Sequence, residues 1–215
     1  MYLPQHFQES DVAVLHQLIR AYPLATLVTL GSDGLNANHI PLLVSAEPAP
    51  FGTLRGHVAR ANPMWKDARA DVAALAVFHG PHAYVSPNWY PTKKQTGRVV
   101  PTWNYVAVHA YGSLKVIDDA TWVRALLQTL TAVHEAAQPV PWTLRDAPEE
   151  FVARMVASVV GVEIVVSSLA GKVKASQNQP LENRAGVVQA LRAQDTDEAR
   201  AMAALVEAGA GTPPA

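Results

Sequence analysis

Two short stretches of the sequence gather side chains that could bind an anionic or heteroaromatic ligand. The first follows a predicted strand, where His57, Arg60 and Asn62 lie within a few residues of one another. These side chains suit a bound anion, because an arginine fork makes parallel charge-assisted hydrogen bonds to an oxyanion. The same residue types also form ordinary solvated turns. The stretch by itself leaves both interpretations open.

The second stretch lies in the C-terminal part of the chain. Lys172 and Lys174 alternate along a predicted strand, so their side chains share one face. Ser176, Gln177 and Asn178 then offer a hydroxyl and two amides, which donate and accept hydrogen bonds. This set beside two cations suits a heteroaromatic ring with carbonyl edges. A polar turn between a strand and a helix has the same composition and stays an alternative.

A gap in the acidic residues separates these stretches. No Asp or Glu lies between Asp71 and Asp118. Interleaved basic and aromatic residues suit a planar anionic ligand or single-stranded nucleic acid, and they equally suit a solvated loop whose aromatics pack on the core. The gap contains Lys93, Lys94, Arg98 and Lys115, together with Trp89, Tyr90, Trp103 and Tyr105.

Composition excludes several classes of protein. The chain has 215 residues, 49% apolar and 16% charged, with a net charge of −1 and no cysteine. The absence of cysteine excludes disulfides and thiolate chemistry, and the near-neutral charge gives no global basic field for nucleic acid. We expect no signal peptide at the N-terminus, since it lacks a cationic end followed by an apolar core, and no apolar run approaches the roughly 20 residues of a membrane helix. We expect a soluble cytoplasmic protein.

Hydrophobic periodicity predicts strands in the first half, then helices, then a further hairpin. No alternation of strand and helix is visible, so we predict an α+β protein with an antiparallel sheet or barrel decorated by helices. The predicted helices are 11–22, 59–68, 121–136, 148–161, 187–193 and 197–208. The predicted strands are 24–30, 35–44, 52–58, 71–78, 82–86 and 103–117, with a hairpin over 162–176 and a long loop over 87–102.

Eight ordered blocks resemble the PaiB-type family, described as FMN-binding negative transcriptional regulators. The match runs from about residue 1 to 192. The blocks are "ATLVTL…NHIPLL", "GHVARANPMW", "FHGPHAYVSPNWY", "VPTWNYVAVHAYG", "LTAVHE", "PW…DAPEEFV", "VGVEI" and "GKVKASQNQP…NRAGV".

The resemblance implies a split β-barrel related to pyridoxamine-phosphate-oxidase-type flavoproteins. It also implies a homodimer with FMN at the subunit interface, and the apolar strands 24–30 and 71–78 favour an interface that includes barrel strands. We expect an FMN-binding split-barrel domain over 1–192 and a helical C-terminal extension with a frayed tail over 193–215.

The resemblance also places the cofactor. In the wider superfamily a basic strand and the turn after the next strand hold the phosphate. Here Asn38 and His39 replace the basic residue, which weakens any case for pyridoxamine-phosphate oxidation. We expect the phosphate near the "HVARAN" turn and the ring near "SQN" and Trp103. The predicted FMN-binding residues are Asn38, His39, His57, Arg60, Asn62, Trp103, Lys172, Ser176, Gln177 and Asn178.

Flavin-dependent oxidoreductase activity is possible for such a protein, but no residue stands out as an acid or base, and we expect no metal site. Two other functions stay open. A repressor that binds DNA directly would have to use the 88–104 loop, because the helix "DTDEARAMAALVEA" has four acids and one arginine. A haem-binding split barrel would take its iron ligand from His39, His57, His79, His82 or His109.

Overall fold

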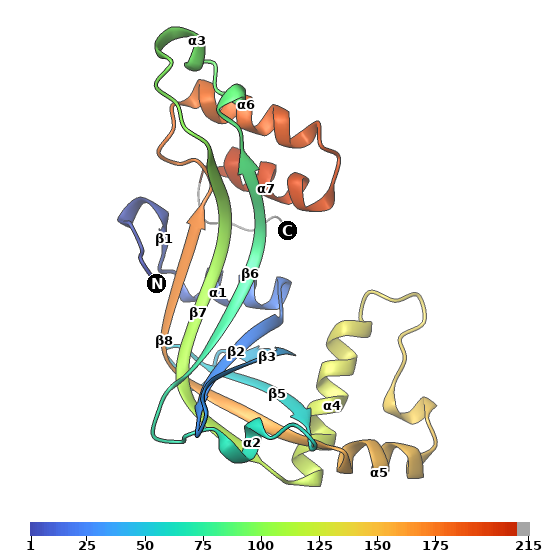
Figure 1. Cartoon of the computed structure of the whole chain (residues 1–215). Helices are drawn as coiled ribbons and strands as arrows, with labels where there is room; N and C mark the ends of the chain where they lie inside the picture. The colour runs from blue at the N-terminus through green and yellow to red at the C-terminus, as the bar shows by residue number, and fades with distance from the viewer. Residues whose placement is uncertain (210–215) are drawn as a thin grey trace. The chain divides into compact units, whose positions relative to one another are not determined.

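A computed structural model describes residues 1–209 (Figure 1). Its helices are α1 (Val12–Ala21), α2 (Met64–Asp67), α3 (Lys93–Thr96), α4 (Ala120–Glu135), α5 (Glu149–Ala157), α6 (Leu181–Arg192) and α7 (Asp197–Ala208), with 3-10 turns η1 (Gln5–Phe7), η2 (Pro87–Trp89) and η3 (Leu144–Asp146). Its strands are β1 (Gln8–Glu9), β2 (Leu24–Gly31), β3 (Gly34–Pro41), β4 (Leu43–Ser45), β5 (Thr53–Ala59), β6 (Ala74–Val85), β7 (Thr102–Ile117) and β8 (Val159–Lys174).

The strands form one sheet in the order β3-β2-β6-β7-β8-β5-β4, with β1 paired to β8. The pairs β1–β8, β2–β3, β4–β5 and β5–β8 are all antiparallel. The prediction of an antiparallel α+β protein decorated by helices is therefore confirmed. The chain divides into two compact units, and the long strands β6, β7 and β8 each contribute to both.

The first unit comprises Pro23–Val77 and Ala110–Ser168, and we call it the barrel unit. Its β3, at one end of the strand order, contacts β5 near the other end, so the sheet closes on itself. Gly56 on β5 permits this closure. A Cβ atom on Gly56 would lie 2.7 Å from Leu42 Cδ2 and 2.8 Å from the Pro41 carbonyl oxygen.

The second unit comprises Met1–Tyr22, Phe78–His109 and Leu169–Ala215, described to residue 209, and we call it the terminal unit. Helix α1 packs Leu15 against Gly171 of β8, where a Cβ would lie 2.1 Å from Leu15 Cδ2. Helices α6 and α7 lie side by side (Figure 1). Gly186 brings α6 against the Trp89 carbonyl oxygen of η2.

Two predicted breaks in the strands are wrong. Strand β6 runs through Gly80 and Pro81, and β8 is one continuous strand where a hairpin was predicted. In both strands the alternation of buried residues shifts by one, which indicates an extra residue of the β-bulge kind. In β6 the buried residues are Ala74, Ala76 and Phe78 and then Pro81, Ala83 and Val85. In β8 the alternation runs through Val160, Val162, Ile164 and Val166 and then through Gly171 and Val173, with Gly161 and Lys172 also buried.

Other boundaries also differ from the predictions. The helix predicted over 59–68 is only the short α2, because β5 extends to Ala59 and a turn follows it. The long predicted loop contains η2 and α3. The expected C-terminal extension begins between α6 and α7, both in the terminal unit, and stays a prediction. Residues 210–215 of the expected frayed tail lie outside the described residues. Within residues 1–209, each helix is too short or too polar to cross a membrane.

We predict that Gly56→Ala lowers the free energy of unfolding by roughly 1–3 kcal/mol, the usual cost of overpacking. The added methyl group collides with the Pro41 carbonyl, so β3 and β5 must separate. Urea denaturation measures the change. The matched control is Ala59→Ser at an exposed site on the same strand, expected within about 0.5 kcal/mol of wild type. Equal stability of Gly56→Ala and wild type would contradict the closure described above.

Candidate functional site

Three asparagines form a hydrogen-bonded chain in the barrel unit. Asn62 Nδ2 donates to Asn38 Oδ1 at 2.7 Å, and Asn38 Nδ2 donates to Asn36 Oδ1 at 2.6 Å. The Met64 backbone N–H donates to Asn62 Oδ1 at 2.9 Å and fixes that amide. We call Asn36, Asn38 and Asn62 the amide cluster. A primary amide has two N–H donors, so Asn38 and Asn62 each retain one for a ligand.

The two predicted histidines of this unit differ in environment. His57 lies on β5 opposite Gly161, and its Nδ1 is buried with no hydrogen-bond partner within residues 1–209. Burial lowers the pKa of His57. The imidazole is therefore neutral near neutral pH and offers one donor and one acceptor. His39 is exposed on β3 and, as the neighbour of Asn38, points to the opposite face of the strand.

Arg60 makes four hydrogen bonds within the chain. Its Nη1 and Nη2 donate to the carboxylate of Asp118 at 2.9 and 2.6 Å. Its Nε donates to the Ala157 carbonyl at 2.7 Å, and Nη2 also donates to the Val159 carbonyl at 3.2 Å. The hydrogen bond from Arg60 lowers the pKa of Asp118. Four of the five guanidinium donors are thus used, and Arg60 ties the turn after β5 to the β7–α4 junction.

The segment Ser176 to Asn178 lies in the terminal unit. Ser176 is buried in the left-handed region at φ 59°, and its Oγ accepts from Asn104 Nδ2 at 2.9 Å. Gln177 is used by the backbone: its Oε1 accepts from the Ala175 N–H and its Nε2 donates to the Val173 carbonyl. Asn178 is exposed. Ser176 and Asn178 of this segment line a cavity.

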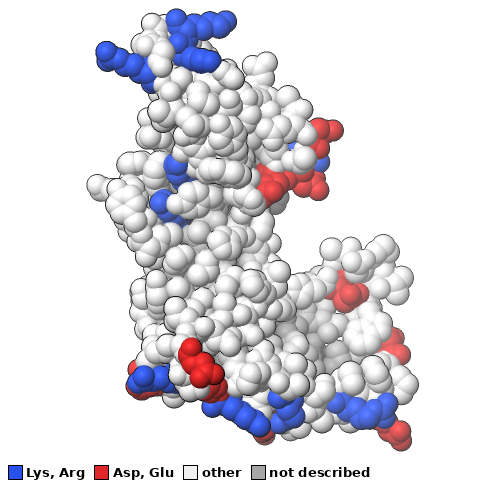
Figure 2. Space-filling model, in the orientation of Figure 1, with Lys and Arg blue, Asp and Glu red and all other residues white. Residues whose placement is uncertain are grey.

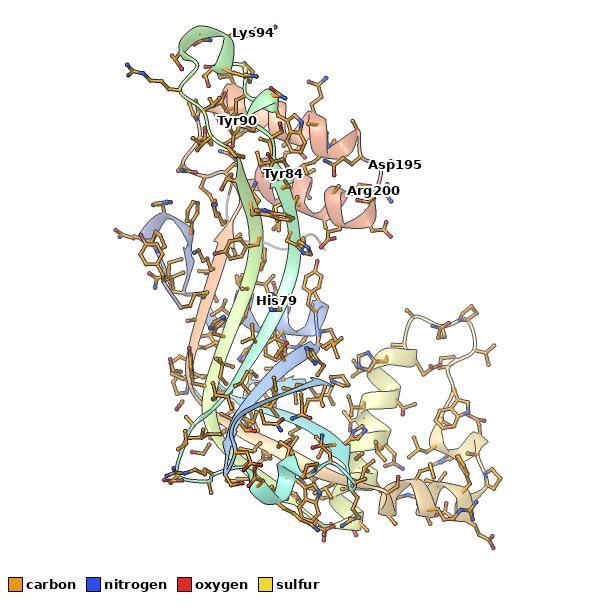
Figure 3. All side chains as sticks on the ribbon, in the orientation of Figure 1. His79, Tyr84, Tyr90, Lys94, Asp195 and Arg200 are labelled. Atoms are coloured by element: carbon orange, nitrogen blue, oxygen red, sulfur yellow. The ribbon has the colours of Figure 1, made fainter. Side chains whose placement is uncertain are left out.

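The remaining two predicted residues of this unit do not join Ser176. Trp103 is 53% exposed and points to the face opposite that of Asn104, its neighbour on β7. Its ring lies 6.0 Å from that of Tyr84, which Figure 3 labels on β6. The Lys172 ammonium is buried, donates to the Tyr2 carbonyl at 3.1 Å and lies over the Tyr2 ring.

The predicted site thus separates into two groups. Asn38 and Asn62 meet in the barrel unit with His57 on the adjoining strand, and Ser176 and Asn178 share a cavity in the terminal unit. Sequence reasoning missed Asn104, a fully buried amide on β7. A lone asparagine in the alternating apolar stretch "WNYVAV" was the available signal, because buried amides require partners.

Comparison with known proteins identifies the family. A family model described as "Putative FMN-binding domain" matches residues 1–168. The "Uncharacterized protein AN0679" of Emericella nidulans is 32% identical, and the alignment covers 96% of each chain. The "Protease synthase and sporulation protein PAI 2" of Bacillus subtilis is 29% identical, over 96% of this chain and 97% of the relative.

Solved structures share the fold. The flavocytochrome Anf3 of Azotobacter vinelandii superposes with a TM-score of 0.57 and 11% identity, over 80% of this chain and 72% of that one. The FAD and heme binding protein of Mycobacterium smegmatis superposes with a TM-score of 0.53 and 15% identity, over 78% of this chain and 73% of that one. The conserved hypothetical protein Rv2991 of Mycobacterium tuberculosis superposes with a TM-score of 0.58 and 13% identity, over 84% of this chain and 94% of that one. The chain belongs to the FMN-binding-domain family, whose cofactor is FMN, and it has the split-barrel fold of flavoproteins.

Proposed function

We propose that this chain binds FMN through its barrel unit, with the flavin phosphate on the amide cluster. The observation that carries this proposal is the Asn62–Asn38 hydrogen bond, which joins the turn after β5 to β3 and aligns two amides with spare donors. The family model ends at residue 168, so it includes these residues and ends before Lys172 and the Ser176 segment. The matched range 1–168 therefore includes all three residues of the amide cluster, which supports the proposal.

The donors present fit a phosphate. A phosphate oxygen accepts several hydrogen bonds, and uncharged N–H groups can hold it when they are aligned in advance. The hydrogen bonds of Asn62 to Asn38 and to the Met64 N–H hold the amide in place. His57 adds a neutral imidazole on the adjoining strand. Arg60 has its donors on Asp118, and we leave it out of the phosphate site.

The chemistry of such a protein resides in its cofactor: bound FMN supplies oxidation and reduction at its ring. The chain has to bind and orient that ring and needs no strong acid or base of its own. We therefore propose flavin-dependent oxidoreductase activity without assigning a catalytic residue.

Charge does not favour a role through direct DNA contact. The basic cluster of Lys93, Lys94 and Arg98 is confined to α3 and the loop after it, and Figure 2 shows blue side chains at this tip. Red side chains gather over α7 in the same unit, where Asp195, Asp197 and Glu198 lie. We propose that any effect on transcription follows from the flavin chemistry.

We also propose that the chain forms a homodimer through the exposed aromatic face of β6 and β7. Tyr84 and Trp103 are 46% and 53% exposed on neighbouring strands and form an edge contact. Two large aromatic side chains side by side on an open sheet are typical of protein interfaces. The expected interface included the apolar strands 24–30 and 71–78, and the face proposed here lies on the later part of β6 and the start of β7 in the terminal unit.

We predict that Asn62→Asp weakens the affinity for FMN by about 10- to 100-fold. The carboxylate keeps the hydrogen bond from the Met64 N–H, loses the amide donor and repels the phosphate. Riboflavin, which lacks the phosphate, should change by less than about threefold. Titration of both ligands, followed by flavin fluorescence, measures the difference.

Two controls accompany this titration. Asn178→Asp makes the same isosteric change in the terminal unit and should leave FMN affinity unchanged. Arg60→Met should lower the midpoint of thermal unfolding, because it removes the tie to Asp118, without weakening FMN. The phosphate lies elsewhere if Asn178→Asp or Arg60→Met weakens FMN binding more than riboflavin binding and Asn62→Asp does not.

We predict that Trp103→Glu converts a dimer into the 23.1 kDa monomer, because the carboxylate would be buried in the interface. Sedimentation velocity at micromolar concentration measures the mass. Trp142→Glu is the matched control, since Trp142 is 45% exposed in the barrel unit and should leave the dimer intact. Dissociation by Trp142→Glu alone would place the interface on the other unit.

We predict that the protein takes up FMN and not haem. The family model that matches residues 1–168 describes an FMN-binding domain, and this favours the flavin. After incubation with both cofactors and gel filtration, the absorption spectrum should show the two flavin bands in the near ultraviolet and blue. An intense Soret band would favour the haem alternative.

A further inference from the structure

The terminal unit contains a cavity that the proposed FMN site does not use. Its volume is about 590 Å³, and it lies among β7, the end of β8, the α3 loop and α6. Lys174, Ser176, Asn178 and Asn183 line it and follow residue 168, where the family model ends, whereas Tyr90, Arg98 and Asn104 line it from within the matched range.

The charge of the cavity is positive. Lys174 and Arg98 line it, and none of its fifteen lining residues is an Asp or Glu. The Lys174 ammonium contacts Thr102 Oγ1 and lies 5.9 Å from the Phe7 ring, with no carboxylate in ion-pair range among residues 1–209. Burial lowers the pKa of Lys174, and Lys172 on the same strand face adds like charge. A half-buried cation without a counter-ion is costly, and a bound anion offsets that cost.

A buried acceptor adds a second requirement for the ligand. Asn104 is 0% exposed and lines the cavity. Its Nδ2 donates to Ser176 Oγ, but its Oδ1 is buried without a partner within residues 1–209. Buried amide oxygens are nearly always hydrogen-bonded, so this atom indicates a missing N–H or O–H donor.

The walls are held rigidly. Asn183 is buried, and its Oδ1 accepts from both the N–H and the Oγ1 of Thr92, which fixes the α3 loop to α6. Tyr90 is buried beside them, and burial raises the pKa of its hydroxyl. The hydroxyl therefore stays protonated and adds no negative charge to the cavity.

We propose that this cavity binds a small oxyanion that carries its own hydrogen-bond donor, at a site separate from FMN. Lys174 and Arg98 neutralise the oxyanion, and Asn104 Oδ1 accepts from the donor. A phosphate monoester in its singly protonated form and a hydroxy- or amino-carboxylate share this chemistry. The acid-free stretch 72–117 contributes Arg98, Tyr90 and Asn104 to the cavity, which gives that stretch a function.

Calorimetric titration with two matched pairs of probes tests the proposal. Inorganic phosphate in mildly acidic buffer is compared with sulfate, and glycolate is compared with acetate. The first member of each pair has an O–H donor and the second has none, so at least one first member should bind about tenfold more tightly than its partner. The pair that discriminates identifies a phosphate ester or a hydroxy-carboxylate. No saturable binding, or equal affinities within both pairs, would overturn the proposal.

Variants locate the binding. Lys174→Met and Arg98→Ala should each weaken the preferred probe by about tenfold or more. The control is Lys94→Ala, which removes a cation at the outer end of α3, away from Tyr90 (Figure 3), and should have no effect. If Lys174→Met does not fold, as judged by circular dichroism, Arg98→Ala decides alone. If Lys94→Ala lowered the affinity for the probe as much as Arg98→Ala does, the proposed location of the site would be wrong.

Each titration is run on FMN-free and FMN-saturated protein. Binding in both preparations supports a separate site, and binding abolished by FMN would assign the cavity to the flavin. A protein that failed to bind FMN would refute the proposed function, and the titration of the FMN-free chain would still test this cavity.

Discussion

Closure of the sheet between β3 and β5 is the contact on which the candidate flavin site depends. It brings together Asn38 and Asn62, which are 24 residues apart in the chain. Gly56 makes the approach possible because any side chain there would strike Pro41 and Leu42. Because the proposed phosphate donors come from two segments that meet in the closed barrel, the proposed site forms when the barrel unit folds.

Local signals predicted the elements whose cause is local. Asp11 and Asp119 cap α1 and α4, and their carboxylates accept from backbone N–H groups of the first turn. The long strands β6 and β8 were misjudged for a different reason. Gly80-Pro81 and the glycine of "SSLAG" resemble turn signals, yet neighbouring strands hold the backbone extended through both places. A shift in alternation and a true turn have similar local sequences, and only the pairing distinguishes them.

The sequence predicted the residue types of the candidate site, but it did not predict that these residues would fall into two groups, one in each unit. The sequence singled out the turn after β5 and the segment after β8, and both are polar and ordered. It could not reveal that Arg60 meets Asp118, 58 residues away, or that Gln177 folds back on its own strand. Nor could it place Trp103 opposite Asn104 without the phase of β7. The Arg60–Asp118 pair depends on long-range contact, the Gln177 hydrogen bonds depend on the turn after β8, and the two predicted groups of donors end in different units.

The most direct test of the account is a crystal structure of the chain with FMN bound. We predict that the phosphate density lies within hydrogen-bond distance of Asn38 Nδ2 and Asn62 Nδ2 in the barrel unit, with Arg60 still paired to Asp118. Phosphate density beside Lys174 and Arg98 in the terminal unit would contradict the assignment of the flavin to the barrel unit and would merge the two proposed sites into one.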